Sequence, residues 1–480
     1  MKLAVSAFTL SATIMAKEKP GIPKGTRDFG PQEVAKRKYI LNTIEQVFIK
    51  YGFMPIETPT MENLSTLTGK YGDEGDKLLF KVLNSGEYLD KVTPEILATN
   101  NTQLATKLIS EKGLRYDLTV PFARYVVMHQ NEITFPFKRY QMQPVWRADK
   151  PQKGRYREFW QCDADVVGSD SLLNELDLTN IYLEVFKALD VEVGIQINNR
   201  KILQGIADYF GCSDKLVEFI TILDKLDKVG YDSVVNELRE KNIIQNSNFD
   251  KIELGKFSEG IQTYQKWEEQ LNRLKQDFES VNSTIGIAGV EELRDILKFI
   301  PVSENVRITP TLARGLSYYT GTIWEVVVLD EKCSLKSSIG GGGRYDNLTG
   351  IFGLNGVSGV GISFGLDRIY DVIEELNKFP VALNQSSTKV LVCCFEENDL
   401  PKALQTLKQL REANIPAEIY ADKVNPKKPL EKPIKYATGK KIPYALLYNT
   451  DGSLTLKNLL AGTQENVLLN AAINQISQSV

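Results

Sequence analysis

The chain has 480 residues, 42% hydrophobic and 25% charged, which is the composition of an ordinary folded protein and excludes disordered, fibrous and membrane-embedded classes. Single hydrophobic cores rarely grow beyond about 250 to 300 residues, so two or three domains are expected. The formal net charge is −3, from 58 basic and 61 acidic residues. Any contact with a nucleic acid must therefore come from local basic patches.

Cysteine and histidine usage restricts the chemistry further. The five cysteines are odd in number and contain no C-x-x-C pair, which argues against a disulfide framework and against a structural zinc site. A reducing cytoplasm fits this pattern. The single histidine, His129, argues against multi-histidine metal centres and imidazole-based triads. We expect His129 to be structural or solvated.

The first fifteen residues, Met1 to Met15, contain one lysine and a short apolar stretch that imitates a secretory signal without a convincing cleavage site. Met15 opens a hydrophilic run that leads directly into the folded pattern. We therefore expect a non-native or disordered extension, with the true start at Met1 or Met15.

A long amphipathic helix is the first predicted element. Apolar residues recur at helical spacing from Gln32 to Tyr51, and Gly52 closes the pattern. The next run, Phe53 to Pro59, contains two prolines and is expected to be an extended strand.

Two strands with a long basic connection follow. Arg139 to Arg147 and Glu158 to Gly168 predict a hairpin, and its tip, Ala148 to Arg157, is rich in basic residues, glycine and proline. Alternation along the second strand predicts a polar face and a packing face. The first holds Phe159, Gln161, Asp163, Asp165 and Val167, and the second holds Trp160, Cys162, Ala164 and Val166.

Helical patterns dominate from Asn198 to Pro301, with long helices expected at Leu216 to Leu238 and Ile261 to Phe278. Strand patterns return at Thr322 to Leu329 and at Val360 to Phe364, before a helix at Leu366 to Leu376. After a polar linker, strands and helices alternate as in a small α/β domain: Val390 to Phe395, Leu400 to Ala413, Ala417 to Tyr420, Lys435 to Lys440 and Tyr444 to Tyr448.

Three stretches carry candidate chemistry. The loop from Arg147 to Arg157 suits phosphate binding, because a guanidinium presents a planar fork to phosphoryl oxygens; a solvated basic loop explains the fragment equally well. Gly340 to Gly343 indicates a backbone that something approaches closely, or a flexible turn. Arg314 precedes two tyrosines that could be ligands or core. No P-loop is present, so arginines would have to hold any nucleotide.

In order and spacing, these stretches resemble the histidyl-tRNA synthetase family of class II aminoacyl-tRNA synthetases. Tyr51 to Pro59 resembles motif 1, Arg147 to Gly168 resembles motif 2, and Gly361 to Arg368 resembles motif 3. Leu312 to Gly321 and Gly341 to Asp346 resemble the two histidine signatures. The resemblance extends over nearly the whole chain.

The departures from the family pattern are few. Ser317 stands where Asp or Asn is usual, and Trp160 where His or Tyr is frequent. Asp117, Leu118 and Thr119 fill the place of the bacterial Glu-Gly-Thr, as in eukaryote-like members.

The resemblance implies a multidomain α/β and α+β fold, in which an antiparallel-sheet catalytic domain carries a helical insertion and is followed by a C-terminal α/β anticodon-binding domain. With the extension at 1–15, the expected segments are the catalytic domain at 16–197 and 302–382, the insertion at 198–301 and the anticodon-binding domain at 388–480.

The implied activity is the ATP-dependent ligation of L-histidine to tRNA(His) through a histidyl-adenylate. ATP is then a substrate and Mg²⁺ its counter-ion, and no structural metal held by the protein is expected. The resemblance also implies a cytoplasmic homodimer with no DNA or membrane partner. The rival interpretation is a histidine-binding regulatory paralogue of the kind that partners ATP phosphoribosyltransferase. Such paralogues usually lack the C-terminal domain and the motif arginines, and both are present here.

The resemblance also implies residue roles. Arg314 and Arg147 are the expected catalytic cations, while Arg147, Arg155 and Arg368 contact ATP phosphates and Gln152 contacts the tRNA. The histidine site is expected to comprise Asp117, Leu118, Thr119, Gln161, Asp165, Tyr318, Tyr319 and Gly341.

Overall fold

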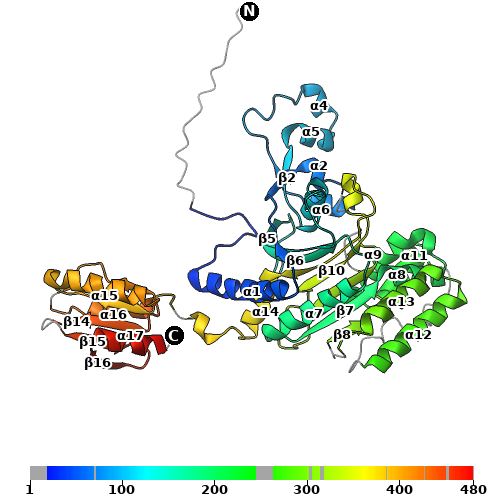
Figure 1. Ribbon diagram of the computed structural model, residues 1–480. Coiled ribbons are helices and arrows are strands. Elements are labelled where there is room, and N and C mark those ends of the chain that lie inside the picture. The colour runs from blue at the N-terminus through cyan, green and yellow to red at the C-terminus, as the bar shows by residue number, and fades with distance from the viewer. Residues whose placement is uncertain are drawn as a thin grey trace, which may run out of the picture. The chain divides into compact units, whose positions relative to one another are not determined.

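The computed structural model describes residues 19–69, 72–244, 263–301, 305–313, 318–384, 386–425, 427–449 and 453–478. The expectation for Met1 to Met15 and the positions of Arg314 and Ser317 lie outside the described residues. The chain folds into two compact units, Met1–Asp28 with Arg37–Asn377 and Phe29–Lys36 with Lys378–Val480, and each is described by itself (Figure 1).

The first unit is built on an eight-stranded sheet with the strand order β1-β5-β6-β11-β10-β9-β7-β8. The pairs are antiparallel except at the two edges, where β1 runs parallel to β5 and β8 parallel to β7. The strand bounds in sheet order are Met54–Pro55, Phe137–Trp146, Glu158–Val167, Gly359–Gly365, Gly340–Tyr345, Thr322–Val328, Val193–Asn199 and Val306–Ile308.

One face of this sheet is an apolar core. Cys162, Ala164 and Val166 of β6 are fully buried there, on the packing face that alternation predicts. Helices α1 (Pro31–Lys50), α7 (Leu173–Ala188) and α14 (Leu366–Glu375) bring rings or apolar side chains to it. Phe364 of β11 is the centre, with ring centroids 5.8 Å from Phe48 of α1 and 4.8 Å from Tyr182 of α7.

The predicted strand from Phe53 to Pro59 is much shorter in the structure, where only Met54–Pro55 forms β1. Proline has no N–H to donate to a ladder, and β1 is an edge strand that pairs with β5 alone. The backbone N–H of Ile56 still donates to the Tyr140 carbonyl at 3.0 Å. The segment is therefore extended, as expected, without being a full strand.

The segment between α1 and β5 in the sequence forms a small layer, which covers the front of the candidate site described below. Its three-stranded sheet has the order β2-β4-β3, with bounds Met61–Asn63, Lys112–Leu114 and Lys81–Val82. Its helices are α2 (Leu64–Leu67), α3 (Gly72–Lys77), α4 (Pro94–Ala98), α5 (Thr102–Ile109) and α6 (Thr119–Met128).

Between β7 and β8 the described chain is helical, with α8 (Arg200–Phe210), α9 (Leu216–Leu223), α10 (Leu226–Val229), α11 (Tyr231–Glu240), α12 (Tyr264–Ser280) and α13 (Thr284–Leu297). The helical pattern expected from Leu216 to Leu238 forms three helices in the structure. Gly230 has a φ of 80°, which a continuous right-handed helix does not allow. Short 3-10 turns occur at Ser213–Lys215 and Thr349–Phe352.

The second unit is a five-stranded mixed sheet with the order β13-β12-β14-β15-β16. Alternate residues of β12 face two cores: Val390 and Val392 pack with α15 residues, while Leu391 and Cys393 pack with Ala437 of α16. The strand bounds in sheet order are Ala417–Ile419, Val390–Cys393, Tyr444–Tyr448, Leu454–Asn458 and Thr463–Val467. The helices are α15 (Leu400–Glu412), α16 (Glu431–Gly439), α17 (Leu469–Gln478) and 3-10 turns at Val381–Asn384 and Glu397–Asp399.

The structure thus confirms the predicted fold class, a mixed sheet with helices and a separate C-terminal α/β unit. Within the described ranges, no helix is both long and apolar enough to cross a bilayer.

Candidate active site

Polar residues occupy the front face of the central strands, opposite the apolar core. Asp163 of β6 lies across from Gln141 of β5 and Ser363 of β11, and Ser363 lies across from Gly341 of β10. Directly opposed residues in a sheet project to the same side. The antiparallel register therefore carries one polar row over four neighbouring strands.

A pocket opens on this face, with about 360 Å³ of space between its atoms, part of which is open to solvent. It brings together most of the residues expected to bind histidine, although they come from β6, β10 and three loops or helix starts. Those that line it are Asp117, Thr119, Gln161, Asp165, Tyr318, Tyr319 and Gly341, and they are joined by Arg147, which is expected to contact ATP. Its other lining residues are Asp163, Gly342, Tyr345, Gly361, Ile362 and Ser363.

Asp165 is held by two buried partners. Its Oδ2 lies 2.7 Å from Nη2 of Arg139, a guanidinium with no solvent exposure, and its Oδ1 accepts a 2.6 Å hydrogen bond from the Tyr345 hydroxyl. The Arg139 guanidinium also stacks over the Phe122 ring, 4.1 Å from the centroid. Burial raises the pKa of Asp165, and Arg139 opposes that rise.

Asp163 is the second buried carboxyl of the pocket. Burial raises the pKa of Asp163 to about 7, against the opposing effect of Arg139 and with a further increase from Asp165. The Ser363 hydroxyl hydrogen-bonds the same carboxyl and also accepts a 2.9 Å bond from Gln161 Nε2. With Asp117, three carboxyl groups face one pocket, so its wall favours a cationic or N–H-bearing ligand.

Arg147 lies at another part of the rim. Its Nε donates to the Tyr116 carbonyl at 3.1 Å, and its guanidinium stacks between two rings, 4.2 Å from the Tyr116 centroid and 5.1 Å from that of Phe159. This packing fixes the guanidinium plane and leaves it positioned for an anion.

Glycines make room for these side chains. A Cβ on Gly361 would come within 1.9 Å of Asp165 Oδ1, and one on Gly343 within 2.7 Å of the Tyr319 ring. The glycine run at Gly340 to Gly343 is therefore not a flexible turn: it forms β10, where backbone and rings approach too closely for a side chain.

Four of the predicted residues do not line the pocket. Leu118 is fully buried, and its carbonyl accepts a weak 3.5 Å bond from Arg139. Arg155 is half exposed and lies 3.6 Å from Asp149, while Gln152 is exposed in a tight turn closed by its backbone bonds with Arg155. Arg368 donates to the Gly154 carbonyl at 2.7 Å and to the Ser338 carbonyl at 2.6 Å.

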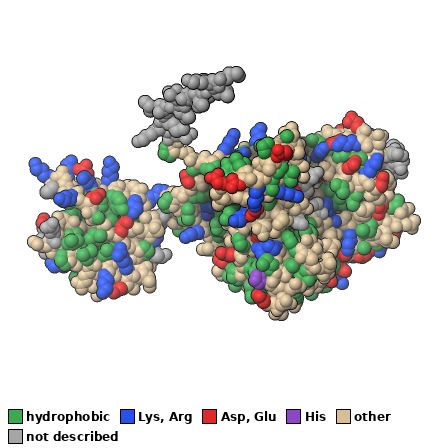
Figure 2. Space-filling view, turned by 90° about the horizontal axis from the view of Figure 1, so that it is seen from above, with side chains coloured by type: hydrophobic (Ala, Val, Ile, Leu, Met, Phe, Trp, Pro, Cys, Tyr) green, Lys and Arg blue, Asp and Glu red, His purple; other side chains and the backbone are tan. Residues whose placement is uncertain are grey.

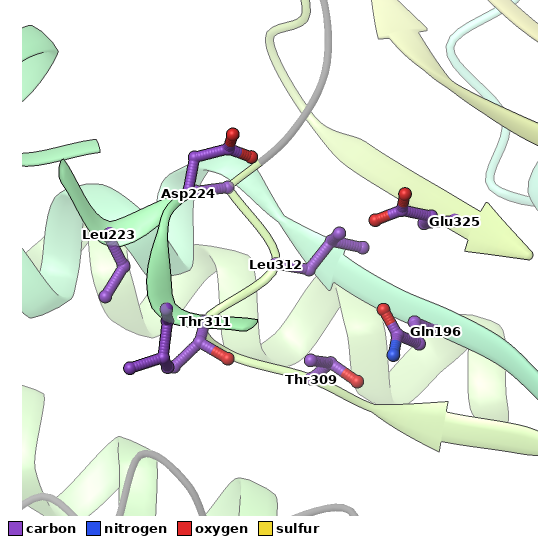
Figure 3. A pocket seen from close by; sticks show the side chains of 9 residues that line it. Gln196, Leu223, Asp224, Thr309, Thr311, Leu312 and Glu325 are labelled. Atoms are coloured by element: carbon purple, nitrogen blue, oxygen red, sulfur yellow. The ribbon is translucent and has the colours of Figure 1, made fainter. Parts of the chain in front are cut away.

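A second pocket lies farther along the same sheet face (Figure 3). Glu325 of β9 and Gln196 of β7 line it with Thr309, and Glu325 lies directly across from Gly341 in the sheet register. Ala313 is also part of this wall. The next residue is Arg314, which lies outside the described residues, so its expected role stays a prediction.

His129 is remote from this chemistry, as expected. It follows α6, its Nδ1 lies 3.0 Å from Glu132, and its ring packs 4.5 Å from Tyr125. The only histidine of the chain is visible at the surface, in purple, in Figure 2.

Comparison with known proteins gives the same family by two independent routes. The family model described as histidyl-tRNA synthetase matches residues 25–369. The histidine–tRNA ligase of Christiangramia forsetii is 52% identical over 462 residues, covering 94% of this chain and 98% of the relative. That of Phocaeicola vulgatus is 53% identical over 458 residues, covering 94% and 97%. The chain belongs to the histidyl-tRNA synthetase family.

A solved member of this family has the same fold. The histidyl-tRNA synthetase of Nostoc sp. PCC 7120 superposes with a TM-score of 0.77 at 29% identity, covering 96% of this chain and 99% of that one.

The stretches that resemble synthetase motifs 2 and 3 meet helix α1 and Arg27 at one buried carboxylate, Asp367. Arg37 of α1 lies 2.5 Å from it, the backbone N–H of Trp160 in β6 donates to it at 2.8 Å, and Arg27 pairs with it as well. Asp367 precedes Arg368, so this junction fixes the start of the helix that carries an expected ATP-binding residue.

Sequence reasoning missed two features of the site. Asp163 lies on the predicted polar strand face without an assigned role, although its spacing from Gln161 and Asp165 is sufficient to place it in the site. The sequence does not single out Arg139, since one arginine at the start of a strand does not reveal that its side chain is buried and pairs with a carboxylate.

Proposed function

We propose that this chain activates L-histidine with ATP and transfers the histidyl group to tRNA(His). The observation that carries the proposal is the convergence of the acidic, amide and tyrosine residues of the histidine signatures on one pocket. Relatives at about half identity over nearly the full chain are named histidine–tRNA ligases. These full-length matches and the C-terminal α/β unit disfavour the regulatory paralogue.

The proposed residue roles follow from charge and position. Asp117 and Thr119 accept hydrogen bonds from the histidine ammonium, Gln161 and Asp165 face the same group from β6, and Tyr318 and Tyr319 enclose the imidazole. Gly341 leaves the pocket open to the substrate, and Leu118 supports the loop from the core.

Activation needs positive charge around the α-phosphate. In the proposed mechanism the histidine carboxylate attacks the α-phosphorus in line, Arg147 and Arg314 stabilise the developing charge, and Arg155 and Arg368 hold the terminal phosphates. A ribose hydroxyl of the terminal adenosine then attacks the acyl carbon. This sequence requires no protein nucleophile.

We also propose Mg²⁺ as the counter-ion of ATP. Mg²⁺ is usually held by substrate phosphates with one or two carboxylates. Among the described residues no group of three His, Cys, Asp or Glu side chains could hold a metal, so the phosphates would supply most of its ligands. The cysteines of the described chain are all free, which supports a cytoplasmic location.

The direct test of the proposed function is aminoacylation. The purified chain should attach histidine, and no other amino acid, to a tRNA(His) transcript in the presence of ATP. Charging of a different tRNA, or attachment of a different amino acid, would contradict the proposal.

We propose a homodimer formed through the motif 1 region. Ile49, Met54 and Met61 are about half exposed there, and β1 is an edge strand. Sedimentation at micromolar concentration should give a species of about twice the 54.0 kDa chain mass. A stable monomer would count against this interface.

The C-terminal unit is proposed to bind the anticodon stem through a basic edge. Residues 423 to 441 contain seven lysines and one acid, Glu431, and all seven lysines are exposed. Reversing Lys432 and Lys435 of α16 to glutamate should raise the KM for tRNA by about tenfold or more, because phosphate contacts dominate such binding. Pyrophosphate exchange should not change.

In the matched control, glutamate replaces Lys402 and Lys408, two exposed lysines on α15 of the same unit. This pair should leave the KM for tRNA nearly unchanged. Equal effects of the two pairs would mean that only overall charge matters, and the proposed edge would be dropped.

Gln152 is proposed to read the extra 5′ guanosine that marks histidine tRNAs. It is exposed in the motif 2 loop, and a side-chain amide can discriminate a base edge by about 1 to 3 kcal/mol. Gln152→Ala should lower the preference for tRNA bearing that guanosine by about 5- to 100-fold. The measurement is kcat/KM for transcripts with and without it, and an unchanged ratio rejects the role.

A further inference from the structure

The two buried carboxyl groups of β6 differ in what they already bind. Asp165 uses one oxygen for Arg139 and the other for the Tyr345 hydroxyl. Asp163 is equally buried, at 2% exposure, but its Oδ1 has no hydrogen-bond partner among the described residues. A buried polar atom without a partner is unfavourable, so such an atom on a residue that lines a pocket points to a ligand.

The orientation of Asp163 is fixed by its neighbours. It sits across the strand pair from Ser363, whose hydroxyl hydrogen-bonds the carboxyl and in turn accepts from Gln161. This anchors one carboxyl oxygen, while Oδ1 has no hydrogen-bond partner among the described residues. Asp163 and Ser363 both line the pocket, so the free oxygen is within reach of whatever fills it.

The surroundings indicate which part of the ligand Asp163 meets. Tyr319 lines the same pocket as Asp163, Asp165 and Asp117. A ring held beside Tyr319 is therefore near Asp163. Asp163 Oδ1 has no hydrogen-bond partner among the described residues, so Asp163 is a β6 carboxyl with capacity to accept from a ring N–H.

We infer that Asp163 is a further specificity-determining residue, which accepts a hydrogen bond from an N–H of the substrate imidazole. This inference rests on the proposed function. The buried acceptor then recognises the imidazole N–H, and a ring without an N–H leaves this acceptor unpaired. Binding sites of this kind discriminate strongly against analogues that lack the donor. Burial raises the pKa of Asp163 to about 7, and a bound donor stabilises its charged form.

The test compares histidine with β-(2-thienyl)alanine, whose ring has a similar size and no N–H, in ATP–pyrophosphate exchange. Asp163→Asn should lower kcat/KM for histidine by at least about tenfold. The kcat/KM for the thienyl analogue should stay within about threefold, as should the KM for ATP, because the variant keeps the size of the side chain and removes its charge, with an NH2 donor in place of one acceptor oxygen. The discrimination between the two amino acids therefore falls.

The matched control is Asp232→Asn, at an exposed position on α11, which should leave kcat/KM unchanged for both amino acids. If Asp163→Asn does not fold, Ser363→Ala is measured instead; it loosens the carboxyl and should reduce the same discrimination. Equal losses for both amino acids, or unchanged use of histidine, would overturn the inference. Absence of histidine-dependent exchange in the unaltered chain would reject the proposed function itself.

Discussion

Replacing Arg147 with alanine is expected to slow histidine-dependent pyrophosphate exchange by about 10²- to 10³-fold, the usual loss when a preorganised charge-stabilising group is removed. The guanidinium is held at the pocket rim between the rings of Tyr116 and Phe159 and by the Tyr116 carbonyl. It therefore needs little reorganisation when charge develops on the α-phosphate. Steady-state exchange at saturating ATP and histidine measures the effect.

Lysine at position 147 should recover little of that rate. An ammonium cannot stack flat between two rings or present a planar fork to phosphoryl oxygens. The matched control is Arg239→Ala, at an exposed position on α11, which should show a normal rate of pyrophosphate exchange. Full activity of Arg147→Lys would show that charge alone suffices and that the ring packing is incidental.

Replacing Arg139 with methionine should lower the free energy of unfolding by about 3 to 5 kcal/mol, the cost of leaving a buried charge without its partner. Arg139 has no solvent exposure and is the cation nearest to Asp165 at 2.7 Å. Without it, Asp165 would lose the guanidinium that pairs with it, and the neighbouring Asp163 would lose a favourable interaction as well. Urea unfolding followed by circular dichroism measures the loss.

The double variant Arg139→Met/Asp165→Leu separates stability from function. Removing both charges should recover most of the unfolding free energy, since apolar replacements of buried pairs are often neutral. Histidine affinity should not recover, because Asp165 is part of the proposed substrate site. Lys91→Met, which breaks an exposed pair with Glu111, is the control and should cost under about 1 kcal/mol. A large loss that persists in the double variant would contradict the pairing argument.

Sequence patterns were sufficient for the elements whose periodicity is local. The helix ending before Gly52, the β5 and β6 hairpin and the polar face of β6 all follow from alternation or helical spacing. The structure adds β15, β16 and α17 of the C-terminal unit, which the patterns missed. The run of residues 463 to 467 is mostly exposed and polar, so it has no buried face from which to recognise a strand.

The pocket required long-range information. Asp117, Gln161 and Tyr318 are far apart along the chain, and only the family resemblance linked them before the structure brought them together. No pattern could show which partners these carboxyl groups have. Asp165 forms an ion pair with Arg139 and accepts a hydrogen bond from Tyr345, whereas Oδ1 of Asp163 has no hydrogen-bond partner in the part of the chain that the structure describes. That difference depends on cross-strand register and burial.

The central claim is that the pocket selects histidine for reaction with ATP. ATP–pyrophosphate exchange measured separately with each of the twenty amino acids tests it most directly, because the exchange reaction does not involve tRNA. The account predicts exchange with L-histidine alone. Exchange driven by another amino acid, or none with histidine in a folded protein, would contradict it.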